Sequence, residues 1–195
     1  ELAEALLNVS RTLTQSGDVV VWSGESMRSQ QTAELVCDAV GAPLLVSAAL
    51  RSFELPGLAG RSESELVAKE SRELEDLLLY RAGLLNSYEI PGIAAPSRKF
   101  ESEVWNWFWP AVTDSGASLV IVIAHRSPVT ALSLAIARRV LAYPDDFYGH
   151  VEIGFCCSLA VRIDALRREP KEIEILGANI RPGQLANYVA GALGQ

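Results

Sequence analysis

Short apolar runs alternate along the chain with segments whose apolar residues recur every three or four positions. Residues 18–23, 43–47 and 118–123 are rich in valine, isoleucine and leucine, which is typical of strands buried on both faces of a parallel sheet. Helical spacing follows two of these runs, over residues 26–40 and from Pro128 onward. Strands that alternate with crossover helices predict a three-layer α/β/α domain with a mostly parallel sheet.

We expect the whole chain, residues 1–195, to form one domain. We expect Val20 and Val122 on neighbouring or near-neighbouring strands, because both runs are apolar throughout and lead into crossover helices. The charged segment 62–85 is rich in helix formers, whereas 88–98 contains two prolines and a glycine and predicts a loop. Together they predict a helical cap insert at about 62–99. The other expected elements are helices at 2–15, 100–112 and 184–193 (the last docked by Leu185, Val189 and Leu193) and strands at 157–163 and 172–176.

His125 lies two residues after the end of the 118–123 strand and is one of only two histidines in the chain. It therefore lies at the carboxyl end of a strand, just before a helix. Open α/β sheets bind ligands at this edge, where helix amino termini favour anions. The alternative is a histidine that caps the helix or bonds to loop backbone.

Composition narrows the classes of partner. A net charge of −7 argues against a nucleic-acid partner, although a local basic pocket could still bind phosphate. No window reaches the roughly 18 apolar residues of a membrane span, so we expect a soluble chain. The three cysteines fit no disulfide framework and no spaced metal motif. We therefore expect no metal or other cofactor, and a reducing compartment such as the cytoplasm or an organelle matrix.

Two stretches resemble signatures of the histidine phosphatase superfamily, the phosphoglycerate-mutase-like family: WSGESMRSQQTAEL (22–35) and VIVIAHRSPVTAL (120–132). In the first, Arg28 begins the family pattern R-x-x-Q-T-A. The resemblance implies a phosphoglycerate-mutase-like fold, with a closing hairpin at 157–176. It also implies that Arg28 and His125 bind phosphoryl oxygens, which suits a guanidinium fork and an imidazole.

The chain departs from the family pattern at several places. No R-H-G strand, whose histidine would be the nucleophile, occurs among these residues. Residues 1–15 resemble the helix that follows that strand, so we expect it upstream, rearranged or supplied by another chain. Its absence would leave two interior strand edges unpaired. His150 is interpreted as a loop or edge-strand residue.

Other site positions also differ. The proton donor position of the family holds Ser52, unless Glu54 takes its place. Arg126 and Ser127 replace a glycine pair after His125, adding side chains where the backbone could otherwise approach closely. Gly24 stands where the family usually has a serine.

These observations leave three functional hypotheses. The first is a degenerate, non-catalytic domain with a residual phosphate pocket for a phosphorylated small molecule or peptide. It would serve as a scaffold or interaction subunit, with Trp107 as a contact for a protein partner. The alternative is an active phosphomonoesterase whose R-H-G strand lies upstream of Glu1, with Glu54 as the acid. The third is an unrelated α/β binding domain.

Overall fold

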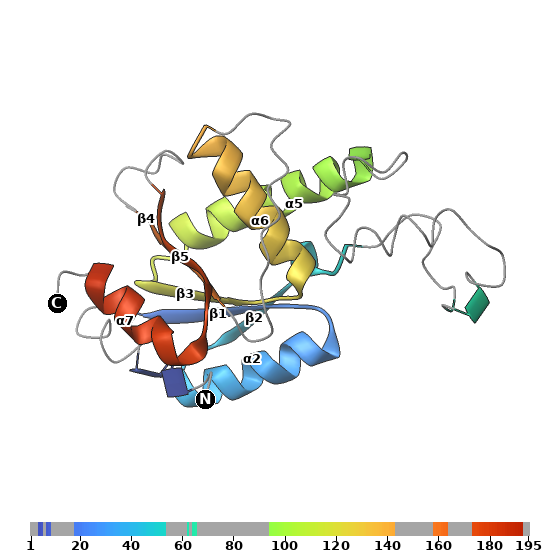
Figure 1. Cartoon of the computed structure of the whole chain (residues 1–195). Coiled ribbons are helices and arrows are strands. Elements are labelled where there is room, and N and C mark those ends of the chain that lie inside the picture. Colours follow the sequence, from blue (N-terminus) through green and yellow to red (C-terminus); the bar gives the residue numbers. More distant parts are fainter. Residues whose placement is uncertain are drawn as a thin grey trace.

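The computed structural model describes residues 4–5, 7–8, 18–53, 62, 64–65, 94–142, 158–163 and 173–192. Glu54, His150, Val189 (as a side chain) and Leu193, which the sequence analysis singled out, lie outside the described part. In chain order the elements are β1 (Val19–Gly24), α2 (Met27–Val40), β2 (Leu44–Ser47), the 3₁₀ helix η1 (Ala48–Leu50), α5 (Ala94–Thr113), β3 (Leu119–Ile123), α6 (Arg126–Arg139), β4 (Ser158–Ile163), β5 (Ile173–Ile180) and α7 (Pro182–Ala192) (Figure 1).

The strands form two sheets. The first has the order β2-β1-β3, with both pairings parallel. Trp22 of β1 pairs with Val122 of β3, and Val20 pairs with Val120. This confirms the prediction that Val20 and Val122 lie on neighbouring strands. Strands β4 and β5 form an antiparallel hairpin. Among the described residues no strand pairing joins β3 to this hairpin, as expected if one interior strand is missing.

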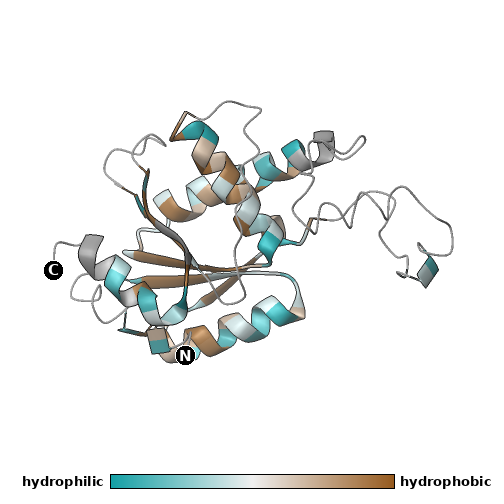
Figure 2. Ribbon diagram, in the orientation of Figure 1, coloured by the Kyte–Doolittle hydropathy of each residue, from teal (hydrophilic) through white to brown (hydrophobic). Residues whose placement is uncertain are grey.

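Helices cover both faces of the parallel strands, which confirms the predicted three-layer α/β architecture. Figure 1 shows α2 and α7 on one face, and α5 and α6 on the other. The parallel strands are hydrophobic along most of their length, whereas much of α2 is pale or hydrophilic (Figure 2). Val21 of β1 and Ile121 of β3 pack in one core cluster with Val36 of α2, Ile180 of β5 and Leu185 of α7. The predicted docking of the tail helix through Leu185 is therefore confirmed.

The opposite face is built from aromatic residues of α5. Trp105 and Phe108 are buried against Ile136 of α6. Trp107 packs against the same cluster, and its ring also meets that of Trp22 edge-on, with centroids 5.5 Å apart. Part of the Trp107 surface is thus used inside the domain, and the side chain is half-buried.

An ion pair also joins α5 to α6. Arg138 donates to Glu101 over 2.5 Å, and their side chains are only 10% and 12% exposed. A pair this well buried is costly to break, because the attraction between the two groups would no longer offset the loss of water around them.

The prediction of a loop over residues 88–98 is wrong at its end, because α5 begins at Ala94. Pro96 is the third residue of the helix. Proline is tolerated in a first helical turn, where its missing N–H would have no partner in the helix. Residues 94–99 of the predicted cap insert are therefore the first residues of α5. The predicted strand 172–176 is also longer than expected, because β5 ends at Ile180.

Candidate functional site

Two helices begin side by side at the carboxyl edge of the parallel strands. The last pair between β1 and β3 is Ser23 with Ile123. Helix α2 starts at Met27, and α6 at Arg126. Parallel strands end at the same edge, so the two helix amino termini meet there. This is the location at which open α/β sheets bind ligands.

The N-cap residues of the two helices are in direct contact. Ser26 is the N-cap of α2 and His125 is the N-cap of α6. The Oγ atom of Ser26 lies 2.7 Å from Nε2 of His125. The backbone N–H of Ser29 donates to the same Oγ over 3.3 Å. Ser26 in turn donates to Oγ of Ser29 over 2.9 Å.

The electrostatics of both helix starts favour an anion. Neither α2 nor α6 has an acidic residue in its first turn. The partial positive charge of each helix terminus is therefore not offset by a carboxylate within that turn. His125, the N-cap of α6, makes no side-chain hydrogen bond to the backbone of its own helix, and its imidazole contacts Ser26 instead. Glu25, which precedes the N-cap of α2, is exposed.

Arg28 is the second residue of α2, and its side chain is exposed. Its carbonyl oxygen accepts a hydrogen bond from Thr32. The described residues provide no carboxylate partner for the Arg28 guanidinium. The contact of Ser26 with His125 brings the first turn of α2 to His125. That Arg28 and His125 share one anion remains a prediction.

The segment after η1 is attached to the start of α6. The backbone N–H of Phe53 donates to Oγ of Ser127 over 2.9 Å. Ser127, which replaces the second glycine of the family pattern, thus has a structural role that the sequence did not suggest. Ser52, at the position of the family's proton donor, is exposed.

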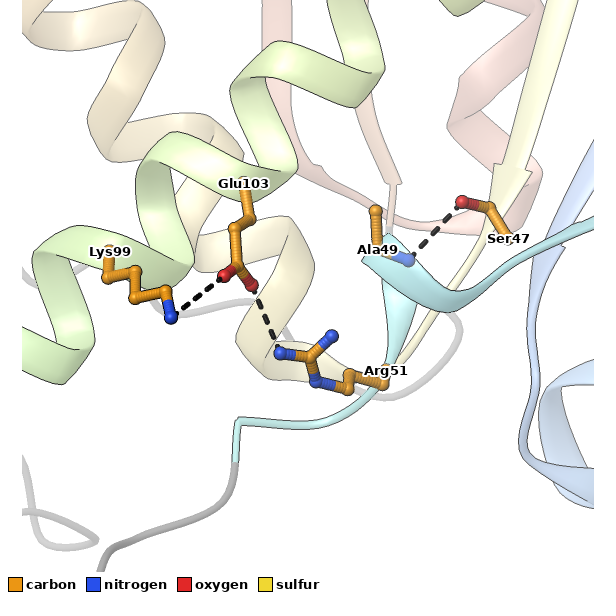
Figure 3. Close-up of polar contacts among 5 residues, drawn as sticks. All are labelled: Ser47, Ala49, Arg51, Lys99 and Glu103. Atoms are coloured by element: carbon orange, nitrogen blue, oxygen red, sulfur yellow. Dashed lines mark hydrogen bonds and ion pairs between the residues drawn. The ribbon is translucent and has the colours of Figure 1, made fainter.

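A second contact holds the same segment to α5 (Figure 3). Arg51 and Glu103 form an ion pair of 3.0 Å, and Lys99 approaches the same carboxylate at 3.8 Å. Ser47 caps η1, because its Oγ accepts from the backbone N–H of Ala49.

Gly24 allows η1 to lie against the end of β1. A Cβ atom at this position would be 2.6 Å from the carbonyl oxygen of Leu50. No real side chain fits at that distance. The glycine that stands in place of the family's usual serine therefore leaves the space that the η1 backbone occupies.

Sequence reasoning identified Arg28 and His125 but missed Ser26 and Ser127. Ser26 could have been found as a serine directly before a helical pattern, which is a common N-cap signal. Nothing local in the sequence indicates that Ser127 bonds to Phe53, since the two are far apart in the chain.

Other candidate chemistry in the described part of the chain is limited. No group of three or more His, Cys, Asp or Glu side chains there could hold a metal ion. No described helix is long and apolar enough to cross a membrane. Cys37 has a free thiol on α2 whose pKa is raised by burial, with a further contribution from the nearby charge of Asp38.

The fold and the site define an α/β domain with an anion-favouring edge, and sequence comparison assigns it to a family. The family model of the histidine phosphatase superfamily (branch 1) matches residues 3–175. The chain therefore belongs to this superfamily. No match was found among curated proteins.

Solved structures of phosphatases share the fold. The alpha-ribazole phosphatase from Shigella flexneri has a TM-score of 0.59 and 20% identity, over 91% of this chain and 81% of that one. A putative alpha-ribazole-5'-P phosphatase from Escherichia coli K-12 has a TM-score of 0.56 and 20% identity, covering 89% and 79%. A mycobacterial glucosyl-3-phosphoglycerate phosphatase has a TM-score of 0.51 and 18% identity, covering 92% and 86%. At these identities the likeness shows the phosphoglycerate-mutase-like fold.

Proposed function

We propose that this domain binds a phosphate group at the carboxyl edge of its parallel strands, through the Arg28 guanidinium and the His125 imidazole. The observation that supports this most strongly is the 2.7 Å contact between Ser26 and His125. It joins the N-caps of α2 and α6 and so supports a site that is shared by His125 and the first turn of α2, which contains Arg28. Both helix termini favour an anion.

We further propose that these 195 residues do not by themselves turn over phosphomonoesters at a useful rate. The family pattern assigns the nucleophile to the histidine of an R-H-G strand, and this sequence has none. The proton donor position holds Ser52, which cannot donate as a carboxylic acid does. Each such group commonly contributes on the order of 10²-fold or more. Binding without an attacking group gives affinity rather than turnover.

A domain that binds phosphate without turnover would act as a scaffold or interaction subunit. Its ligand would be a phosphorylated small molecule or peptide, and the names of two structural relatives contain a phosphorylated small molecule. A protein partner would be contacted by the exposed part of Trp107.

The test combines binding and turnover on the full chain. We expect inorganic phosphate to bind the wild type, and Arg28→Gln to weaken binding about 10- to 100-fold, since a charged hydrogen bond contributes about 1.5–3 kcal/mol. Arg139→Gln is the matched control. It removes the same charge from the last residue of α6, about 20 Å from His125 at 1.5 Å per residue.

Turnover is measured with an aryl phosphate. We expect none above the uncatalysed rate. Turnover that is abolished by His125→Ala would refute the non-catalytic proposal and require an unrecognised nucleophile, with His150 tested first. Phosphate binding that is unchanged by Arg28→Gln would refute the pocket.

One observation supports the second candidate, an active phosphomonoesterase. Strand pairing stops at β3 and resumes only within the β4-β5 hairpin, among the described residues. A further strand between them would join the two sheets, and soluble folds avoid unpaired interior edges. If that strand carried R-H-G, it would bring a nucleophilic histidine into the sheet next to β3. The test is to read the coding sequence upstream of Glu1 and assay a chain extended by any R-H-G segment found there.

A further inference from the structure

We infer that Ser26 is the positioning residue of this site: it fixes which ring nitrogen of His125 carries a proton and which faces the ligand. The inference rests on the proposed phosphate site but concerns a residue that the family pattern does not assign. It follows from the hydrogen bonds around one oxygen atom.

The Oγ atom of Ser26 has three polar neighbours. Its hydrogen is donated to Oγ of Ser29, 2.9 Å away. It accepts from the backbone N–H of Ser29. The third neighbour is Nε2 of His125, at 2.7 Å. A serine hydroxyl has a single hydrogen and two lone pairs. Because this hydrogen is directed to Ser29, we infer that Nε2 is the donor in the contact with Ser26.

The direction of this hydrogen bond determines which ring nitrogen of His125 carries the proton. A neutral imidazole carries one N–H, so a protonated Nε2 leaves Nδ1 as the acceptor. Nδ1 of His125 has no hydrogen-bond partner among the described residues. When the ring takes up a second proton, Nε2–H stays on Ser26 and Nδ1–H is free to donate to a phosphate oxygen. Ser26 thus holds the ring plane and directs the other nitrogen toward an anion.

A capping role alone does not explain this arrangement, as Ser47 shows. Ser47 is the N-cap of η1 at the end of the neighbouring strand β2, and its Oγ accepts from the N–H of Ala49 over 3.3 Å. Ser26 accepts from Ser29 over the same 3.3 Å. Of the two serine caps, only Ser26 also contacts a histidine. Ser47→Ala is therefore a matched control that removes an equivalent cap without touching His125.

The experiment measures the ¹⁵N chemical shifts of the His125 ring in the full chain without phosphate, at a pH where the ring is neutral. We expect wild type to show the Nε2–H tautomer. Ser26→Gly should shift the ring toward the tautomer mixture of a free imidazole, while Ser26→Thr, which keeps the hydroxyl, should retain the wild-type tautomer and Ser47→Ala should not change it. Glycine is a suitable replacement because it is itself an accepted N-cap, so the helix should still form.

Inorganic phosphate is then titrated into the same variants. We expect Ser26→Gly to weaken binding about 5- to 10-fold, since it loses the orientation given by one hydrogen bond, and Ser26→Thr to bind within about 2-fold of wild type. A ring tautomer that is the same in wild type and Ser26→Gly would overturn the inference. So would tighter phosphate binding by Ser26→Gly, because Ser26 would then compete with the ligand for Nε2. If wild type bound no phosphate while the tautomer still followed Ser26, the proposed function would fail and the positioning role would stand.

Discussion

Replacing Gly24 by alanine should destabilise the domain, because the added methyl group has no space. A Cβ atom at this position would lie 2.6 Å from the carbonyl oxygen of Leu50 and 3.2 Å from its carbonyl carbon. Carbon–oxygen contacts are normally no shorter than about 3.3 Å, so the backbone of η1 would have to move by about 0.7 Å. Leu50 itself is 2% exposed, so it cannot move without disturbing the core.

The expected loss is about 1–3 kcal/mol of unfolding free energy, the range for overpacking a close contact. It is measured by equilibrium denaturation followed through tryptophan fluorescence. Gly183→Ala is the matched control. Gly183 is the second residue of α7, and a Cβ atom added there would meet nothing within 4 Å. This change should be neutral or stabilise the helix by up to about 1 kcal/mol. A Gly24→Ala protein with the denaturation midpoint of wild type would refute the reasoning.

Three further results are expected. Ser127→Ala removes the acceptor for the Phe53 N–H and should lower the unfolding free energy by about 1 kcal/mol in the same denaturation assay; no change would mean that this bond adds nothing. Glu101→Gln removes the carboxylate that accepts from Arg138 in a site only about one-tenth exposed and should reduce stability by about 1–3 kcal/mol, the range for losing a charged hydrogen bond, whereas a loss well below about 1 kcal/mol would contradict a buried pair. The raised pKa of the Cys37 thiol means less thiolate at a given pH, so alkylation near neutral pH should be slower in the native protein than in denaturant; equal rates would contradict this.

The fold could be predicted to a large extent, because the buried parallel strands leave a clear pattern. The runs that became β1 and β3 are apolar throughout, and only two-sided burial requires this. The start of α5 was misjudged, because Pro91, Gly92 and Pro96 together indicate a loop. Pro96 in fact lies in a first helical turn, where proline is compatible with the helix.

The site was only partly predictable. Arg28 and His125 belong to motifs that are contiguous in sequence, so each could be recognised. The contact between Ser26 and His125 joins residues 99 positions apart, and the contact between Phe53 and Ser127 joins residues 74 apart. Such contacts depend on which strand lies beside which, and hydrophobic periodicity does not contain that information. The close contact between Gly24 and the backbone of Leu50 is unpredictable for the same reason, because it can be recognised only when the position of η1 is known.

The central claim is that Arg28 and His125 bind the same phosphate. It is tested most directly by titrating inorganic phosphate into the full chain while following the Arg28 side-chain NεH and the His125 ring together by NMR. The account predicts that both sets of signals move with a single dissociation constant, and that Arg28→Gln weakens the response of His125. A His125 response that is independent of Arg28, or signals that move with different dissociation constants, would contradict it.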